Sequence, residues 1–512
     1  MTRLALAVGF LVGSPVAQDL VWQFPSPPSD ARHHEITPFV DHDGDGYRDL
    51  LLLVQPNIST SGIGEAQIRS GRDGAVLWQS SQGVVQRAAD AGDLDGDGKH
   101  EVAVLIPCCT TNARTIRVLS PTTGQLFWQQ SGPFYGNYGR AVLGDIDTNG
   151  DGQPDLVTIT SDPSDSRVFV YDHTGATRYV LNVLGTGMAV SLGKMPDMNG
   201  DGADDFLVGI TDGGRGVVRL LSGLTGAVLR TNFGLMVGDK TCDHVRSFGD
   251  LDGDSVEDYG AFPWITANRA IVVVWSGATG QVLRTWDEFA NAVVTGEDVD
   301  LDGVPDMVIG ADWQVTTAPP HVYGRTRAYS GRDGLELWRV DNAPFVPYGM
   351  GGTGTFGWME SAVSLGVQPG EAYPAIAWLD TEWWTVGTQR GRVRAFRSNH
   401  AGQGPILGRP CASSGPLPRI GVRRHPVATG PAQARISIAD GPPGGGAWLD
   451  VGFAASPQYA GLRLPIDLAP FGLGGCHLRV APVFAAFVAL GSTGIDAGYG
   501  FVDLPAQLTA SA

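Results

Sequence analysis

The chain has 512 residues, of which 43% are hydrophobic, so it can bury a sizeable core and is not a disordered protein. Its formal net charge of −18 argues against nucleic acid as a partner, because phosphate binding needs a basic face. With 72 glycines, 33 prolines and only 17% charged residues, the composition indicates many short strands joined by turns rather than helices.

The N-terminal residues are typical of a short secretory signal. Arg3 precedes an apolar run over residues 4–12, and a stretch of small residues ends at Ala17. We therefore predict a signal peptide over residues 1–17 and an exported protein, either secreted or at the cell surface. Pro15 is unfavourable three residues before the cut, and a buried N-terminal strand is the alternative. No later apolar run is long enough to span a bilayer, so we predict no transmembrane segment.

A nine-residue acidic loop recurs six times along the chain and is seen most cleanly over residues 93–101. Carboxylates at positions 1, 3, 5 and 9 converge on one point, and a glycine at position 6 permits the sharp turn that this requires. Such an oxygen-rich arrangement suits a hard cation, and calcium is the default because magnesium demands a tighter octahedron. We number the loops 1 to 6, and their candidate ligands are Asp41, Asp43, Asp45 and Asp49; Asp93, Asp95, Asp97 and Glu101; Asp147, Asn149, Asp151 and Asp155; Asp197, Asn199, Asp201 and Asp205; Asp250, Asp252, Asp254 and Asp258; and Asp298, Asp300, Asp302 and Asp306.

Not all six loops are equally good sites. Ser255 replaces the turn glycine in loop 5, and Asn149 and Asn199 replace a carboxylate in loops 3 and 4. We expect those three loops to bind more weakly. For a single loop, a solvated turn is the alternative interpretation. For the set, we predict up to six structural Ca²⁺ ions, each held with a dissociation constant on the order of 10⁻⁴ to 10⁻³ M.

The loops also mark a structural repeat, since they begin 48 to 54 residues apart. In each unit a strand leads into the loop and an apolar strand leaves it, as over residues 102–106. A hairpin follows, as over residues 116–128, and its turn contains small and polar residues. Four strands per unit of about fifty residues indicate a β-propeller blade. The hairpin turns are Ser70–Gly74, Ser120–Gly124, Asp172–Gly175, Ser222–Gly226, Ser276–Gly280 and Ser330–Gly334.

The two ends of the repeat region predict how the ring closes. A seventh hairpin over residues 392–402 lacks a fourth strand, whereas residues 20–24 resemble the fourth strands at 76–79 and 126–129. We predict that this N-terminal strand completes the last blade of a seven-bladed propeller spanning residues 18–404, which leaves no exposed sheet edge. The acidic loop of the last blade has decayed at residues 367–374, and we predict no metal there.

The loops are not EF-hands, because position 12 lacks the bidentate glutamate and strands rather than helices follow. They resemble instead the FG-GAP, or VCBS-like, repeat of integrin-alpha-type propellers. Ser191–Gly193 before loop 4, together with loop 4 and loop 6 themselves, carries that resemblance best. It covers roughly residues 19–402 and implies that a calcium loop joins two strands of each blade.

From about Pro405 the composition shifts toward Gly, Ala, Pro and Leu, and the acidic loops end. We predict a small antiparallel β-sandwich over residues 405–512, stapled by a disulfide between Cys411 and Cys476. Cys108, Cys109 and Cys242 are interpreted as small core or loop residues rather than ligands.

No catalytic motif stands out in the sequence, and His33–Glu35 is interpreted as a surface segment rather than a metal site. The favoured function is a monomeric, non-enzymatic binding or adhesion protein for an extracellular glycan or protein ligand. Late tryptophans such as Trp378 are expected to pack between blades, although one or two could line a carbohydrate surface. The alternative is a propeller enzyme, either a polysaccharide lyase or a quinone-dependent dehydrogenase suggested by the turns at 73–78 and 333–338.

Overall fold

In the computed structural model every described element is a β-strand. The described residues are 20–24, 31–56, 64–80, 85–107, 114–132, 137–162, 165–182, 187–211, 216–235, 242–262, 271–286, 290, 292–300, 302–312, 324–334, 336–341, 358–369, 374–383, 389–397, 419–425, 433–439, 446–453, 458–459, 462–463, 466–467, 477–478, 481–489 and 500–503. The described part of the chain contains no helix that could span a membrane. The predicted signal peptide lies outside the described residues.

Six four-stranded antiparallel sheets, called blades 1 to 6, are each built from four consecutive strands. Their strands are β2 (Ala31–Pro38), β3 (Leu50–Pro56), β4 (Glu65–Arg69) and β5 (Val76–Gln79); β6 (Arg87–Gly92), β7 (Glu101–Pro107), β8 (Arg114–Leu119) and β9 (Leu126–Ser131); β10 (Val142–Ile146), β11 (Asp155–Ile159), β12 (Arg167–Tyr171) and β13 (Thr177–Asn182); β14 (Met188–Met195), β15 (Asp205–Thr211), β16 (Gly216–Leu221) and β17 (Val228–Phe233); β18 (His244–Gly249), β19 (Asp258–Phe262), β20 (Val272–Trp275) and β21 (Val282–Trp286); and β22 (Ala292–Glu297), β23 (Asp306–Asp312), β24 (Gly324–Tyr329) and β25 (Glu336–Asp341).

A further four-stranded sheet is composite, because it combines the two ends of the repeat region. It consists of β26 (Trp358–Val367), β27 (Pro374–Trp383), β28 (Gln389–Arg397) and the N-terminal strand β1 (Leu20–Phe24). β1 runs antiparallel to β28 with Phe24 opposite Val393, as expected for the strand that completes this sheet.

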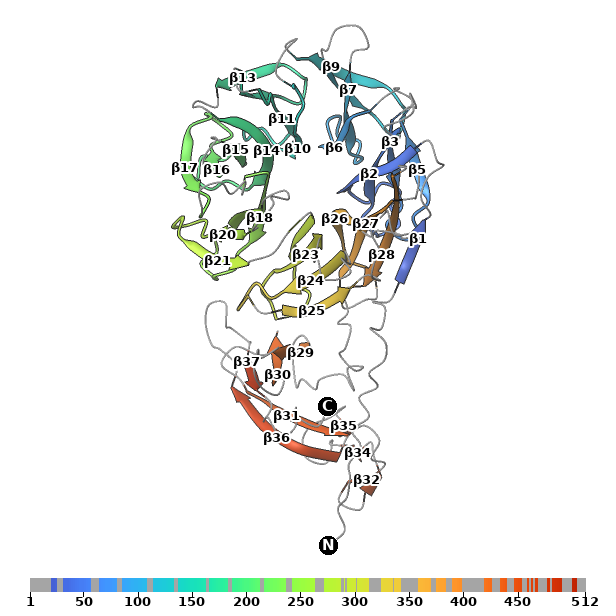
Figure 1. The fold of residues 1–512 in the computed structure, drawn as a ribbon, viewed down its shortest axis with the longest axis vertical. Helices are drawn as coiled ribbons and strands as arrows, with labels where there is room; N and C mark the ends of the chain where they lie inside the picture. The colour runs from blue at the N-terminus through green and yellow to red at the C-terminus, as the bar shows by residue number, and fades with distance from the viewer. Residues whose placement is uncertain are drawn as a thin grey trace, which may run out of the picture.

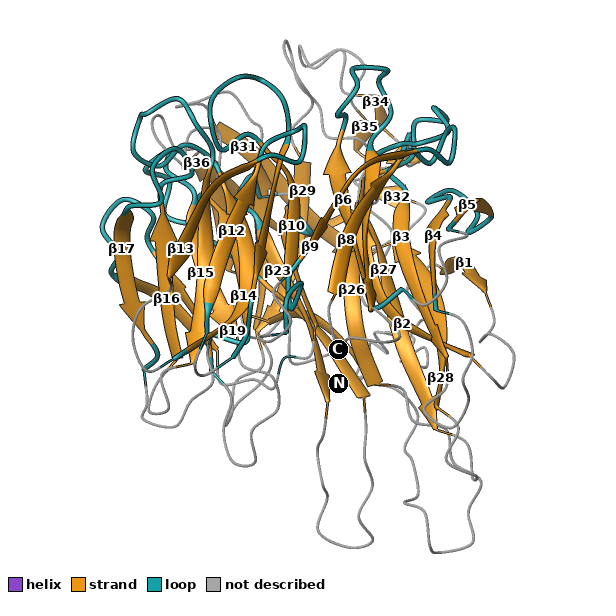
Figure 2. Ribbon diagram, turned by 90° about the horizontal axis from the view of Figure 1, so that it is seen from above, coloured by secondary structure: helices purple, strands orange, loops and turns teal. Residues whose placement is uncertain are grey.

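The sheets form a ring around a central axis (Figure 1). The first strands β2, β6, β10, β14, β18, β22 and β26 are innermost, and neighbouring blades contact one another in sequence around the circle, with β26 contacting β2. Seen from the side, the strands of the ring stand side by side with loops at both ends (Figure 2). The prediction of an all-β propeller is confirmed.

Burial differs between the strands of a blade and follows their sequences. The second strand, such as β11, is buried along its whole length, and all its residues except Asp155 and Thr158 are apolar. The fourth strand, such as β9, alternates or exposes its side chains because it forms the outer edge. The core lies between sheets: apolar side chains of neighbouring blades form one cluster at each interface, and a further cluster joins blade 1 to the composite sheet.

The described residues of the C-terminal region also form strands. These are β29 (Arg419–His425), β30 (Gln433–Ala439), β31 (Gly446–Phe453), β32 (Gln458–Tyr459), β33 (Leu462–Arg463), β34 (Ile466–Asp467), β35 (His477–Leu478), β36 (Ala481–Ala489) and β37 (Gly500–Asp503). They pair as β29-β30-β37, β31-β36, β32-β33 and β34-β35. The sandwich arrangement of these sheets stays a prediction, and Cys411 and Cys476 lie outside the described residues.

Candidate metal centres

All six acidic loops occupy the same place in their blades, between the innermost strand and the second strand. They therefore lie at one end of the ring. In each loop the position-1 aspartate accepts hydrogen bonds from backbone N–H groups of its own loop. In loop 2, Asp93 Oδ1 accepts from Gly96 N at 2.7 Å, and Asp93 Oδ2 accepts from Gly98 N at 2.9 Å. These bonds hold the loop in a tight curl with its carboxylates on the inside.

The curl needs a residue at position 6 that tolerates a left-handed backbone. Gly98 has φ +84°, and the other position-6 glycines are similar. In loop 5 the same place is taken by Ser255, which adopts φ +67°. A left-handed conformation costs a non-glycine residue roughly 1 kcal/mol, so loop 5 holds the same shape at a higher cost. This finding supports the prediction that loop 5 is a weaker site.

The carboxylates converge in four of the loops. Ligand atoms of three acidic residues lie within 4.8 Å of one another in Asp41, Asp43 and Asp45; in Asp93, Asp95 and Glu101; in Asp250, Asp252 and Asp254; and in Asp298, Asp300 and Asp302. Carboxylates this close repel one another unless a cation lies between them or protons bind. Such clusters of hard oxygen atoms fit a cation of the calcium type. Positions 1, 3 and 5 are thus brought together as predicted in loops 1, 5 and 6.

In loops 3 and 4 an asparagine stands at position 3. Polar side chains lie next to the remaining carboxylates, where a bound cation would otherwise offset their charge. The side-chain amide of Asn199 donates to Asp201 Oδ2 at 2.9 Å. The hydroxyl of Ser222, in the hairpin turn, donates to the same oxygen at 2.9 Å. In loop 3, His173 Nδ1 lies 3.7 Å from Asp151 Oδ2. The two hydrogen bonds in loop 4 partly satisfy Asp201 without a metal, which agrees with weaker binding there.

Loop 6 contains a competitor that the sequence did not reveal. The guanidinium of Arg332 donates from Nε to Asp302 Oδ2 at 3.2 Å and from Nη2 to Asp302 O at 3.0 Å. Arg332 belongs to the hairpin turn, thirty residues after Asp302. Its charge offsets one of the three clustered carboxylates. Loops 1 and 2 have no such partner among the described residues and are the least obstructed sites.

The position-9 carboxylate is set apart from the others because it is buried. Asp49, Glu101, Asp155, Asp205, Asp258 and Asp306 are at most 3% exposed. In loop 5, Asp258 Oδ2 accepts from Leu251 N at 2.8 Å, inside the loop, and Asp258 Oδ1 accepts from Gly277 N at 2.9 Å, in the hairpin turn. The same pair of bonds occurs in loops 1, 4 and 6. Position 9 therefore ties the acidic loop to the Ser-Gly turn of the same blade.

The glycine in those turns is required by this close approach. A Cβ atom at Gly277 would lie 1.9 Å from the carbonyl oxygen of Glu257, in the acidic loop. Gly71, Gly223 and Gly331 meet their loops in the same way. The Ser-Gly dipeptide that recurs in the sequence is thus the place where the hairpin turn packs on the acidic loop.

Blade 2 departs from the pattern at this contact. Pro121 stands where the turns of blades 1, 4, 5 and 6 have glycine, and proline has no N–H to donate. Glu101 Oε2 still accepts from Leu94 N at 2.8 Å, but its Oε1 is buried without a hydrogen-bond partner. Glu101 belongs to the same cluster as Asp93 and Asp95. A buried carboxylate with a free oxygen beside two further carboxylates fits a metal ligand. The residues of loop 2 therefore fit a bound metal better than those of the other loops.

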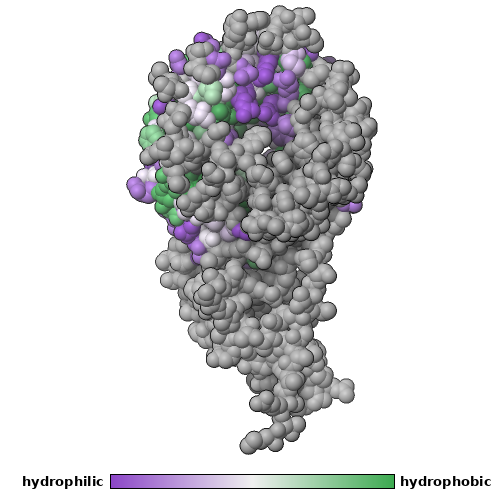
Figure 3. Space-filling model, viewed as in Figure 1, coloured by the Kyte–Doolittle hydropathy of each residue, from purple (hydrophilic) through white to green (hydrophobic). Residues whose placement is uncertain are grey.

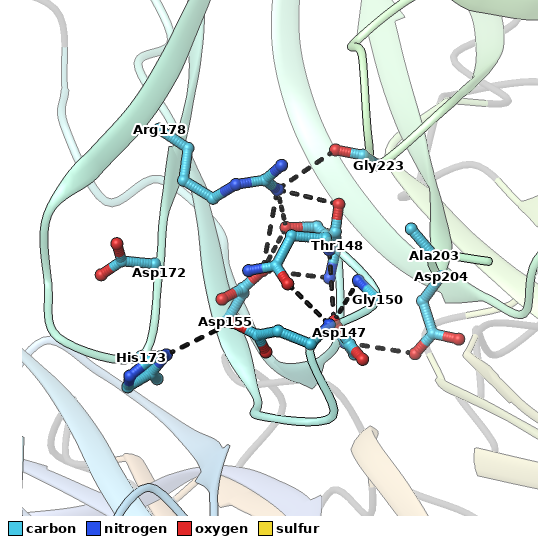
Figure 4. A network of polar contacts seen from close by, with 12 residues as sticks. Asp147, Thr148, Gly150, Asp155, Asp172, His173, Arg178, Ala203, Asp204 and Gly223 are labelled. Atoms are coloured by element: carbon cyan, nitrogen blue, oxygen red, sulfur yellow. Dashed lines mark hydrogen bonds and ion pairs between the residues drawn. The ribbon is translucent and has the colours of Figure 1, made fainter. Parts of the chain in front are cut away.

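Blade 3 also departs from the pattern, as Figure 4 shows. Its turn is one residue shorter and offers no glycine at that place, and Asp155 Oδ1 is buried without a hydrogen-bond partner. Inside the loop, Thr148 donates both its N–H, at 3.0 Å, and its hydroxyl, at 2.5 Å, to Asp155 Oδ2, and Arg178 lies 3.7 Å from the same oxygen (Figure 4). Arg178 also donates to the carbonyl oxygen of Gly223 in blade 4, at 3.4 Å. The carboxylate of loop 3 is thereby connected to the neighbouring blade.

Burial dominates the electrostatics of position 9. Desolvation raises the pKa of Asp49, Asp155, Asp205 and Asp258 to about 6 and that of Glu101 to about 7, against the lowering effect of their hydrogen bonds. Burial and the neighbouring Asp300, Asp302 and Asp298 also raise the pKa of Asp306. Without a cation, these side chains hold protons at a higher pH than ordinary carboxyls do.

Other residues singled out in the sequence have mixed outcomes. Cys242 is buried, as interpreted. Trp378 is 4% exposed and packs in the core, whereas Cys108 and Cys109 lie outside the described residues. The interpretation of residues 33–35 as a surface segment is wrong for His33, which is 4% exposed. The decayed loop of the composite sheet is described only in part, since residues 370–373 are not included, and its lack of a metal stays a prediction.

Hydrophilic side chains also gather on the part of the ring near β6 and β7 (Figure 3). β6 contributes Asp90, whose Oδ1 lies 2.8 Å from His100 Nδ1 of the acidic loop in the same blade. Burial raises the pKa of Asp90, although its bond to His100 opposes this rise. The end of the ring that holds the acidic loops therefore includes further acidic groups.

No protein-family model matches the chain. No curated protein sequence matches it either. Solved structures with a similar course of the chain include the V. cholerae biofilm matrix protein Bap1, with TM-score 0.42 and 12% identity over 75% of this chain and 91% of that one. They also include a europium-containing methanol dehydrogenase, with TM-score 0.42 and 11% identity over 74% and 93%, and the exotype rhamnogalacturonan lyase YesX, with TM-score 0.40 and 14% identity over 75% and 76%. At these values the likenesses support no inference about function, and the fold rests on the strand pairing described above.

Proposed function

We propose that this chain is an exported β-propeller of the FG-GAP type whose acidic loops hold structural Ca²⁺ ions. The convergence of three acidic residues within 4.8 Å in loops 1, 2, 5 and 6 carries the proposal. The orphaned buried Glu101 Oε1 in loop 2 supports it. Positions 1, 3 and 5 would hold the ion in loops 1, 5 and 6, where position 9 connects the loop to the rest of the blade. In loop 2, Asp93, Asp95 and Glu101 would hold it. The ion would supply positive charge that offsets the repulsion between the carboxylates.

Calcium titration by calorimetry tests this assignment. We expect the wild-type chain to bind several ions and Asp95→Asn to lose about one of them, because this residue is part of the loop 2 cluster. Asp73→Asn is the matched control, since Asp73 is exposed and its carboxylate accepts from Ala75 N in a hairpin turn, outside the acidic loops. Equal stoichiometry in wild type and Asp95→Asn would count against loop 2 as a site.

The pH dependence of the calcium effect is a second expected result. The raised position-9 pKa values mean that the metal-free fold binds more protons than the unfolded chain between about pH 4 and about pH 7. The metal-free protein therefore loses stability as pH rises through this window, whereas calcium competes better as protons leave. We expect the increase in Tm caused by calcium to be larger at about pH 7.5 than at about pH 5. Scanning fluorimetry at both pH values, with calcium or with EDTA, measures it, and an increment that does not change with pH would contradict the argument.

We further propose that the composite sheet acts as the seventh blade and that the propeller is a non-enzymatic binding or adhesion protein for an extracellular glycan or protein. The pairing of β1 with β28 supports closure, because it joins the start and end of the repeat region. Within the ring, tryptophans of the outer strands donate hydrogen bonds to the hairpin turn of the next blade. Trp128 Nε1 donates to His173 O at 3.0 Å, and Trp286 Nε1 donates to Gly334 O at 3.1 Å. A rigid ring of this kind presents loops at fixed positions. A glycan array combined with a lyase assay on acidic polysaccharides separates this role from the alternative of a polysaccharide lyase.

A further inference from the structure

A second group of charged side chains lies near the opposite ends of the innermost strands, away from the acidic loops. Arg87 begins β6, Arg140 lies two residues before β10, and Arg246 lies in the first half of β18. Glu35 of β2 joins them through an ion pair: Arg87 Nη1 lies 2.9 Å from Glu35 Oε2, although the two residues are 52 positions apart in the chain. These four residues come from blades 1, 2, 3 and 5, at or just before their innermost strands.

This group has a surplus of positive charge. Four arginines interact through their charges with one another or with the carboxylates of Glu35 and Asp243. They are Arg87, Arg114, Arg140 and Arg246. Among the described residues this group holds four guanidinium groups and two carboxylates, a surplus of two positive charges, in a chain whose formal net charge is −18. Burial and the nearby Arg87 lower the pKa of Arg140, and burial together with Arg87 and Arg140 lowers that of Arg114. Like charges are therefore close together here.

The arginines keep hydrogen-bonding capacity to spare. Arg246 Nη1 donates to Val293 O at 2.6 Å, which anchors one end of its guanidinium to β22. No hydrogen bond or ion pair holds the guanidinium of Arg140 within the described part of the chain. The side chains of Arg87 and Glu35 are 27% and 35% exposed, so solvent and solutes can reach them. A guanidinium that is crowded by other cations and lacks a partner favours an incoming anion.

His244 adds a neutral polar group to the same place. Its ring stacks on Phe262 with centroids 4.9 Å apart and 13° between the planes, and Arg246 lies 5.9 Å from the centre of that phenyl ring. Burial and Arg246 lower the pKa of His244 to about 4, so the imidazole is neutral near pH 7. Phe262 thereby fixes the orientation of one neutral and one cationic donor.

This mixture of groups suits one class of ligand. Planar guanidinium forks match a carboxylate. The Glu35 carboxylate repels a second negative charge but accepts hydrogen bonds from hydroxyl groups, which disfavours sulfate and phosphate. We propose that Arg87, Arg140 and Arg246 bind the carboxylate of a uronic acid residue in an acidic saccharide, with Glu35 accepting from its hydroxyl groups. This proposal rests on the binding role given above and names its ligand class, but it does not depend on the metal.

Saturation-transfer NMR with the full-length protein tests the site, with galacturonate as the probe and galactose, sulfate and phosphate as the comparison solutes. We expect galacturonate to bind, galactose to bind detectably more weakly, and neither sulfate nor phosphate to displace galacturonate at equal concentration. Arg140→Gln should weaken galacturonate binding about tenfold, or about 1.4 kcal/mol. Because the Arg140 guanidinium makes no described contact, this variant should keep the wild-type Tm.

Two further variants keep the test decisive. Arg117→Gln removes an arginine of β8 that pairs with Gln129 at an exposed position, and it should bind galacturonate as wild type does. Glu35→Gln should raise the affinity for sulfate, because it removes the repelling charge. The proposal is overturned if galacturonate does not bind, if Arg140→Gln binds it as tightly as wild type, or if sulfate displaces it equally well. None of these results bears on calcium binding, which is measured separately by calorimetry.

Discussion

Removing calcium with EDTA is expected to lower the Tm of this protein by about 5 °C. If free calcium is about ten times the dissociation constant, each occupied loop stabilises the fold by about 1.4 kcal/mol. In loops 1, 2 and 5 three carboxylates converge and no arginine of the described residues donates to them, so together they contribute about 4 kcal/mol. The unfolding entropy of a propeller of this size converts that free energy into about 5 °C.

Scanning calorimetry or fluorimetry with EDTA, and again after calcium is restored in excess, measures the shift. A triple variant that combines Asp43→Asn, Asp95→Asn and Asp252→Asn should lose most of the increase in Tm that calcium causes, since each substitution disables one of the three loops. In EDTA, the same triple variant should have nearly the Tm of the wild type, because these position-3 side chains are exposed. A Tm that is the same with calcium and with EDTA would remove the structural role of the metal.

The largest effect of a single substitution is expected at position 9. Asp258→Asn should destabilise the fold by about 3 kcal/mol, because the amide can accept only one of the two buried N–H groups that Asp258 now satisfies. These groups are Leu251 N at 2.8 Å and Gly277 N at 2.9 Å. The loss should be present in EDTA as well as in calcium, since the bonds join the acidic loop to the hairpin turn without any metal. Chemical denaturation in both conditions measures it.

Two controls separate this framework role from metal binding. Asp252→Asn, in the same loop, removes a candidate ligand at an exposed position and should have little effect in EDTA. Glu101→Gln should cost less than Asp258→Asn, because Glu101 accepts from only one backbone N–H, that of Leu94. If Asp258→Asn destabilises only in the presence of calcium, then position 9 acts as a ligand and the framework argument is wrong.

The repeat and its loops could be predicted because their signals are local. The period of about fifty residues, the buried apolar second strands and the glycine at position 6 all follow from neighbours in the chain. The N-terminal strand could also be matched to the composite sheet, since residues 20–24 resemble other fourth strands and do pair with β28. The prediction that loops 3, 4 and 5 bind more weakly depends in the same way on local residues, Asn149, Asn199 and Ser255.

The contacts that join one segment to another were not readable. Position 9 was expected to be a ligand like the others, and only the fold shows that its oxygens meet the Ser-Gly turn some twenty residues later. Arg332 reaches Asp302 across thirty residues, and the sequence gives no sign that it shares loop 6 with a cation. His33 was expected at the surface, but its strand lies against the core and buries it.

The sequence by itself therefore determined the all-β class, the repeated blade and the positions of the acidic loops, because each depends on the spacing of residues within about fifty positions. Only the tertiary structure decided which carboxylates converge, which one is buried as a tie within its blade, and that Arg87 of β6 pairs with Glu35 of β2, 52 positions earlier in the chain. The physical reason is that a closed ring brings the starts of distant strands to one place, and no local pattern records that meeting.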